Sequence, residues 1–405
     1  MAKSNSGNYT YDGIETGAER VTQEIEEHIA ELEVKGSRIK KLSMFGYSLG
    51  GLVARYSIGL LFSNGWFDRI EPINFTTFAS PHLGVRTPIL GPHSRLWNVL
   101  GARTLSTSGR QLFSIDTFRD TGRPLLLVLA DPHSIFMQAL ARFKHRVLYA
   151  NIVNDRSAPY YTTFITKVDP YAADHSAIDI HYMKGYEPNI IDTADPVSKK
   201  LPDPSRGLLS RVASNSQNVL TTVPFVAAMV VFIPIGTLLF LANAGVQSIR
   251  SQKRIKLHES GRAGVGLGNY RIPLIMENAR SAVEDTFGSM TGTRNQQYLP
   301  AGIEQDASPS HDSEDEKHRS PAKSNRKRRR RSSAQQPTFP TLNLSSEQFE
   351  MIENLNEAEW RKYAVHIHDV RHTHAAIIVR STPLRSKFEE GKRIVGHWIE
   401  EEFEV

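Results

Sequence analysis

The chain has 405 residues, 40% of them hydrophobic, which is enough for one large folded domain or two ordinary ones. Its net charge is +6, but seven positive charges lie at Lys323 and 326–331, which leaves 6 − 7 = −1 for the rest of the chain. No nucleic-acid-binding surface is therefore expected on the folded body. The chain has no cysteine, which excludes disulfides, cysteine-ligated zinc and thiol nucleophiles. The N-terminus lacks the apolar region of a signal peptide, so secretion through a cleaved signal is not expected.

The first half of the chain alternates helical and strand patterns. Apolar residues at 21, 25, 29 and 32 predict a helix that ends at Gly36, and strands are predicted over 39–45, 73–78 and 146–153. Helical patterns lie between these strands. The alternation predicts the α/β class, with a mostly parallel sheet flanked by helices on both faces.

The pentapeptide Gly46-Tyr47-Ser48-Leu49-Gly50 stands between the first predicted strand and the helix that follows it. A G-x-S-x-G motif at a strand-to-helix junction is typical of a nucleophile elbow, in which the serine oxygen is lifted above the sheet. The flanking glycines, Gly46 and Gly50, are expected to let strand and helix cross closely, and Gly51 extends this side-chain-free turn. Ser48 is therefore a candidate nucleophile, with a plain turn serine as the alternative.

An uncharged stretch begins after the first half of the chain. No charged residue occurs between Arg211 and Arg250, and Val219–Ala242 is almost wholly apolar. As a helix these 24 residues would be roughly 36 Å long, enough to cross a hydrocarbon core of about 30 Å. Pro224 and Pro234 leave both a span and a monotopic hairpin open, and a buried core helix is the alternative to membrane insertion.

Residues from about 292 to 338 are polar and highly charged, and they are predicted to form a disordered basic insert. Order is expected to resume near Leu344, with a capped helix over "SSEQFEMIENLNEAEWRKY". Short strands are then expected over Ala364–His368 and Ala375–Val379, around a turn rich in histidine.

A serine nucleophile needs a base and an acid that orients the base, in the chain order Ser, Asp or Glu, His. Asp155 follows a predicted strand and is the candidate acid, with a turn aspartate as the alternative. His374 precedes an apolar run and is the candidate base, with His372 second. The cluster of His366, His368, His372 and His374 also permits a metal site, but carboxylates at ligand spacing are lacking except Asp369. No metal or cofactor is therefore predicted.

Several segments together carry a resemblance to a known family. These are "TYDGIETGAERVTQEI", "FGYSLGGLVARY", "FASPHLGVR", "GRQLF", "LYANIVNDRSAPYYTT" and "HTHAAIIVR". They resemble the fungal branch of the putative serine esterases, the lipid-droplet phospholipase-like group of α/β-hydrolases. The resemblance implies a serine lipase or phospholipase with Ser48 as nucleophile, Asp155 as acid, His374 as base and a glycerolipid as substrate.

One feature departs from the family. Members of the family begin with a strand that carries a His-Gly pair, and the loop after this strand donates a backbone N–H to the oxyanion hole. In this sequence no such pair precedes Ser48. The sequence therefore predicts an N-terminally truncated hydrolase, either a truncated gene model or a degraded relative. Leu49 supplies one oxyanion donor. Loss of the other would lower activity by about 10²–10³. The alternative function is a catalytically impaired, membrane-anchored interaction protein.

These predictions divide the chain into four parts and place it at a lipid surface. The expected parts are a hydrolase core over 1–202, a membrane-associated segment with its flanks over 203–291, the disordered insert over 292–340, and the C-terminal part of the core over 341–405. The expected location is the cytosolic face of a membrane or a lipid droplet, with a lipid as substrate.

Overall fold

The structure is a computed structural model that describes residues 2–86, 106–155, 157–172, 178–199, 245–266, 270, 339–380 and 388–405. The predicted apolar segment Val219–Ala242 and residues 292–338 of the predicted insert lie outside the described residues. Among the described residues, no helix is long and apolar enough to cross a membrane.

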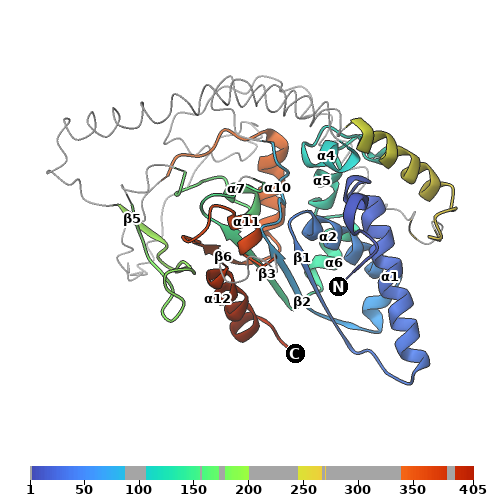
Figure 1. Cartoon of the computed structure of the whole chain (residues 1–405), viewed down its shortest axis with the longest axis horizontal. Coiled ribbons are helices and arrows are strands. Elements are labelled where there is room, and N and C mark those ends of the chain that lie inside the picture. Colours follow the sequence, from blue (N-terminus) through green and yellow to red (C-terminus); the bar gives the residue numbers. More distant parts are fainter. Residues whose placement is uncertain are drawn as a thin grey trace, which may run out of the picture.

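A four-stranded parallel sheet forms the centre of the described part (Figure 1). In spatial order its strands are β1 (Lys41–Tyr47), β2 (Glu71–Phe78), β3 (His145–Asn151) and β6 (Arg361–Val365). β4 (Ile178–Ile180) and β5 (Val197–Lys199) form a separate antiparallel pair. The predicted α/β class with a mostly parallel sheet is therefore confirmed.

The helices lie around this sheet and between its strands in the chain. Their bounds are η1 (Gly7–Tyr11), α1 (Ile14–Val34), α2 (Leu49–Ser63), η2 (Trp66–Asp68), α4 (Thr107–Leu112), η4 (Arg119–Thr121), α5 (Leu125–Leu129), α6 (Ile135–Ala141), α7 (Tyr160–Thr163), α10 (Ser346–Asn356), α11 (Thr373–Ala376), α12 (Glu389–His397) and η8 (Trp398–Glu402). A further helix covers residues 245–259.

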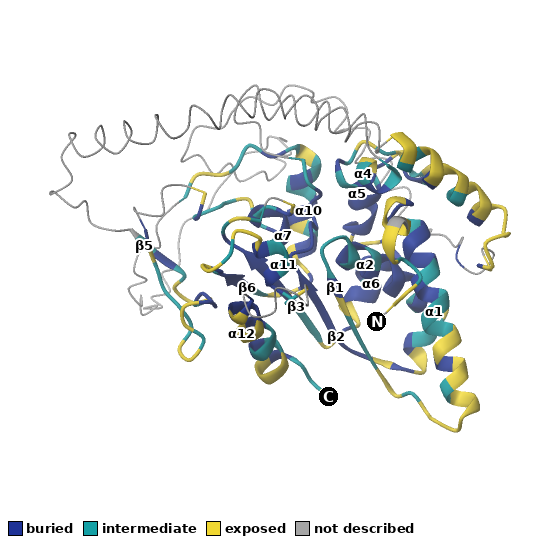
Figure 2. Cartoon of the chain, viewed as in Figure 1, coloured by how far each residue is buried: buried dark blue, intermediate teal, exposed yellow. Residues whose placement is uncertain are grey.

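Two hydrophobic clusters occupy the two faces of the sheet. Phe75 and Leu148 point toward α2, α5 and α6, whereas Phe78 and Tyr149 point toward α12. The alternation follows from the two-residue period of side chains along a strand. Figure 2 shows the inner strands as buried. β2 is buried from Pro72 to Phe78 and β3 from Val147 to Asn151, because a parallel sheet is covered on both faces.

The predicted capped helix near residue 346 is confirmed. α10 begins after Ser345, whose hydroxyl accepts a hydrogen bond from the backbone N–H of Gln348, while the Gln348 side chain accepts one from the backbone N–H of Ser345. This reciprocal pair is a capping box, and it satisfies two backbone donors at the helix start.

The predicted strand over Ala375–Val379 is wrong. The chain forms the short helix α11 there, and the backbone N–H groups of Ala376 and Ile377 donate to the carbonyls of His372 and Thr373. A five-residue apolar run does not distinguish a strand from a buried helical turn by its pattern alone. The other predicted short strand, over Ala364–His368, is present as β6 but begins and ends three residues earlier.

Candidate active site

Ser48 lies at the turn between the carboxyl end of β1 and the first residue of α2. Its backbone has φ 54° and ψ −131°, a conformation that costs about 1–3 kcal/mol for a residue with a side chain. The backbone N–H of Ser48 donates to the carbonyl of Phe78 at 3.0 Å, which fixes the turn against β2. The strained turn has the form of the nucleophile elbow that the sequence predicts.

Two glycines allow this turn, but they are not the expected pair. A Cβ atom on Gly46 would lie 2.3 Å from the Gly51 Cα, and one on Gly51 would lie 2.1 Å from the Ser80 Oγ. A Cβ on Gly50 would meet nothing within 4 Å. The close crossing of strand and helix therefore requires Gly46 and Gly51, and the steric role expected for Gly50 is wrong. The motif spacing drew attention to Gly50, whereas helix geometry turns Gly51 toward the strand.

The structure brings the three predicted residues into one chain of hydrogen bonds. His374 Nε2 lies 2.9 Å from Ser48 Oγ, and His374 Nδ1 lies 2.8 Å from Asp155 Oδ2. The neighbouring carboxylate favours a proton on Nδ1, which leaves Nε2 as an acceptor for the serine proton. The side chain of His374 is 16% exposed and that of Asp155 is 2% exposed. The proton acceptor is thus reachable, whereas the carboxylate is enclosed.

Asp155 is held by several donors besides the histidine. Its Oδ1 accepts from the backbone N–H groups of Ser157 at 3.1 Å and Ala158 at 2.9 Å, and its Oδ2 accepts from Asn151 Nδ2 at 2.9 Å. Asn151 is the last residue of β3, so the acid is anchored to the sheet. A carboxylate with these donors has a fixed orientation, and its negative charge is stabilised by hydrogen bonds.

Two contacts position His374 itself. The Tyr47 hydroxyl donates to the backbone carbonyl of His374 at 2.9 Å, and the two rings lie 5.0 Å apart. The Thr373 hydroxyl donates to the Val153 carbonyl at 2.9 Å, which ties α11 to the loop that carries Asp155. The sequence places Tyr47 and Thr373 directly beside Ser48 and His374, but adjacency alone did not reveal these roles.

The remaining histidines of the cluster are not at the site. His372 is exposed at the start of α11, while His366 Nδ1 lies 2.8 Å from the Tyr182 hydroxyl and His368 Nδ1 lies 2.9 Å from Glu390 Oε1. Among the described residues, no group of three or more His, Cys, Asp or Glu side chains could hold a metal ion.

Leu49 is the first residue of α2, so its backbone N–H has no carbonyl acceptor within the helix. The residue after the nucleophile commonly supplies one oxyanion-hole donor, and the positive end of the helix dipole favours negative charge at the same place. Within the part of the chain that the structure describes, we identify no second donor. The roles of Ser48, Leu49, Asp155 and His374 in catalysis stay predictions.

Comparison with known proteins gives one family. The model of the family described as "Putative serine esterase (DUF676)" matches residues 1–168. The matched part contains Ser48 and Asp155, whereas His374 lies beyond it. The resemblance to the putative serine esterases is therefore confirmed for the N-terminal part of the chain.

Three curated fungal relatives are similar over the same part. "Putative lipase ROG1" of Saccharomyces cerevisiae is 32% identical over 157 residues, which is 38% of this chain and 22% of the relative. "Putative lipase C4A8.10" of Schizosaccharomyces pombe is 30% identical over 164 residues, 38% of this chain and 20% of the relative. "Putative lipase YDL109C" of Saccharomyces cerevisiae is 36% identical over 142 residues, 34% of this chain and 21% of the relative. The chain thus spans about a fifth of the length of these relatives. No solved structure matches.

Proposed function

We propose that this chain is a serine hydrolase of lipid esters, with the α/β-hydrolase arrangement and Ser48, His374 and Asp155 as its catalytic triad. The observation that carries the proposal is the continuous hydrogen-bonded series from Ser48 Oγ through the imidazole of His374 to Asp155. The family match to putative serine esterases supports the reaction class, and the names of the fungal relatives as putative lipases support a lipid substrate.

The residues suggest a two-step reaction. Ser48 Oγ attacks the ester carbonyl carbon while its proton passes to His374 Nε2, and the Leu49 N–H donates to the oxyanion. Collapse of the tetrahedral intermediate breaks the bond to the alcohol oxygen, which takes the proton from Nε2. Water then attacks the acyl-serine in the same way, giving up a proton to Nε2, and the released Ser48 oxygen takes that proton back. Asp155 keeps the imidazole in the required tautomer throughout.

A fluorophosphonate probe tests this proposal, because it reacts only with an activated serine. We expect the chain to be labelled and Ser48→Ala to lose the label. Ser80→Ala is the matched control, since Ser80 is a buried serine beside the elbow whose hydroxyl donates to the carbonyl of Phe78, and its replacement should leave the label in place. An unlabelled parent chain would reject the hydrolase and favour the catalytically impaired interaction protein.

The proposal also places the protein at the cytosolic face of a membrane or on a lipid droplet. The uncharged run Val219–Ala242 supports this location, because its length matches the hydrocarbon core of a bilayer. Deletion of residues 219–242 is expected to move the protein from the membrane or droplet fraction to the soluble fraction. Sedimentation with membranes at the level of the intact chain would reject an anchoring role for this run.

A further inference from the structure

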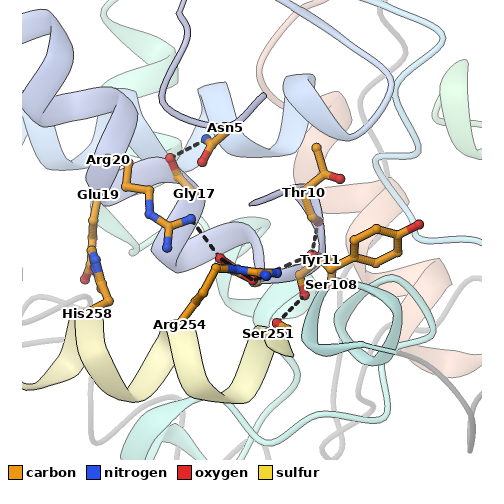
Figure 3. Close-up of polar contacts among 12 residues, drawn as sticks. Asn5, Thr10, Tyr11, Gly17, Glu19, Arg20, Ser108, Ser251, Arg254 and His258 are labelled. Carbon is orange, nitrogen blue, oxygen red and sulfur yellow. Dashed lines mark hydrogen bonds and ion pairs between the residues drawn. The ribbon is translucent and has the colours of Figure 1, made fainter. Parts of the chain in front are cut away.

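The helix over residues 245–259 turns its polar side toward the protein. Ser251 is 1% exposed and His258 is 0% exposed, and together with Arg254 they lie at spacings of three and four along one face. Figure 3 shows all three side chains pointing from this helix toward α1 and the segment before it. A surface helix normally directs an apolar stripe inward, so this helix has the reverse arrangement.

Buried charges hold the inner face in place. Arg254 Nε lies 3.0 Å from both Asp12 oxygens, and its Nη2 lies 2.7 Å from Asp12 Oδ1; Arg20 contacts the same carboxylate at 3.0 Å. His258 Nε2 lies 2.6 Å from Glu19 Oε2, with both side chains fully buried. Loss of Arg254 or His258 would remove a close partner from a buried carboxylate, which is costly. The orientation of the helix is therefore fixed, and so is the direction of its outer face.

The outer face combines apolar and basic residues. Val246, Ile249 and Leu257 are 47%, 60% and 48% exposed, and Arg250, Lys253 and Lys256 are exposed beside them. At about 100° per residue all six positions fall within roughly a third of the helix circumference. This sector contains no carboxylate, because the only acidic residue of the helix, Glu259, lies to one side. Among the described residues, no carboxylate forms an ion pair with these three cations. Figure 2 shows the outer side of this helix as exposed.

We propose that this outer face, defined by Val246, Ile249, Arg250, Lys253, Lys256 and Leu257, is a docking surface for anionic lipid headgroups. Basic residues with interspersed apolar ones suit the boundary between headgroups and acyl chains, where the cations meet phosphate and the apolar side chains leave water. The helix also begins three residues after the uncharged run 219–242 ends. The biological role of this docking rests on the proposed function as a lipid hydrolase, but the docking itself does not depend on Ser48.

The absence of cysteine allows a local test on the full chain. Ile249→Cys would carry an environment-sensitive fluorophore, and Lys35→Cys, at the exposed end of α1, would carry the same probe as the matched control. Vesicles of phosphatidylcholine alone are compared with vesicles in which one third is phosphatidylserine. We expect a blue shift at position 249 with the anionic vesicles, a smaller one with the neutral vesicles and none at position 35.

Three results of this test would overturn the proposal. An unchanged spectrum at position 249 would show that the face does not reach the lipid. Equal shifts with both kinds of vesicle would show that headgroup charge is not recognised. A spectrum already blue-shifted without vesicles would show that another part of the chain, or a second copy of it, covers the face.

Removal of the charges tests the same surface in a second way. The triple change Arg250→Gln, Lys253→Gln, Lys256→Gln should lower affinity for the anionic vesicles by about fivefold per cation. The matched control Lys35→Gln, Arg38→Gln, Lys40→Gln changes the net charge equally at exposed positions on another part of the molecule and should retain affinity. Equal losses in both variants would overturn the proposal. Thermal unfolding midpoints equal to that of the parent chain would verify that both variants fold.

The two proposals can fail separately. A chain that is labelled at Ser48 but does not respond to anionic vesicles keeps the hydrolase and rejects the docking surface. A chain that binds the vesicles but is not labelled rejects the hydrolase and keeps the docking surface.

Discussion

Two histidine–carboxylate pairs in this molecule have similar contact distances, but they use different ring nitrogens, Nδ1 in His374 and Nε2 in His258, and have different surroundings. His374 lies 2.8 Å from Asp155, and His258 lies 2.6 Å from Glu19. The second nitrogen of His374 faces the serine hydroxyl, while that of His258 has no hydrogen-bond partner among the described residues. His374 is partly exposed, whereas His258 is fully enclosed.

The difference shows what turns such a pair into a candidate dyad. An enclosed pair can only hold two elements together, and the His258–Glu19 pair joins the helix over 245–259 to α1. A pair with reactivity also needs a nucleophile at its second nitrogen and a path for the substrate. We therefore expect changes at the His374–Asp155 pair to lower activity and changes at the His258–Glu19 pair to lower stability.

The largest effect is expected at the His374–Asp155 pair. Asp155→Asn and His374→Ala should each lower hydrolysis by about 10⁴-fold, because the serine proton then has no oriented acceptor. Ester hydrolysis by the purified variants measures this, and His372→Ala is the control, since His372 is exposed outside the site. Ser48→Ala combined with His374→Ala should be little worse than Ser48→Ala alone, because triad members act as a unit. Additive losses, or a larger loss in His372→Ala, would contradict the assigned roles.

The next effect is expected at the enclosed pair, in stability rather than activity. His258→Leu should lower the free energy of unfolding by about 3–5 kcal/mol, because it leaves the Glu19 carboxylate buried without this partner. The double change Glu19→Leu with His258→Leu should recover much of the loss. Urea unfolding measures the energies, and hydrogen exchange over residues 245–259 locates them. Unchanged hydrogen exchange over residues 245–259 in His258→Leu would contradict the inference that this pair joins the helix to α1.

His82 extends the comparison to a buried histidine whose neighbouring charges are cationic. Burial, aided by the nearby charges of Arg55 and Lys362, holds the pKa of His82 well below its usual value. Below about pH 6.5 the unfolded chain therefore binds a proton that the native chain does not. The free energy of unfolding should fall as the pH decreases, by at most about 1.4 kcal/mol per pH unit for this group.

Urea unfolding at several pH values below 6.5 measures this slope in the parent chain and in His82→Gln. The variant replaces the imidazole with a side chain that does not titrate and can still bond the Thr77 hydroxyl, which lies 3.0 Å from His82 Nε2. The slope should become shallower in the variant. An unchanged slope would assign the acid sensitivity to other groups.

The smallest effect is expected at Tyr47, which helps to position His374. Tyr47→Phe removes the hydroxyl that donates to the His374 carbonyl and should raise the barrier or lower stability by about 0.5–1.5 kcal/mol. A lower kcat/KM for a soluble ester would show a raised barrier, whereas a lower free energy of unfolding of the same variant would show a loss of stability. A loss as large as that of His374→Ala would show that Tyr47 takes part in the reaction directly.

Much of the site could be predicted because its parts carry strong local signals. The strand-to-helix serine, the carboxylate after a later strand and the histidine near the end follow a fixed chain order, and the structure brings those three together. The error at α11 arose because five apolar residues suit a strand or a helical turn equally. The contact between His258 and Glu19 spans 239 positions, and no local pattern relates residues that far apart.

The backbone angle of Ser48 has a consequence for selection. A residue held at φ 54° would be relaxed by glycine, so Ser48→Gly is expected to raise the unfolding temperature while it removes the proposed nucleophile. A library of this chain sorted only for heat resistance should therefore enrich the change, and one sorted for ester turnover should discard it. At position 48, thermal stability favours glycine, whereas the proposed reaction requires serine.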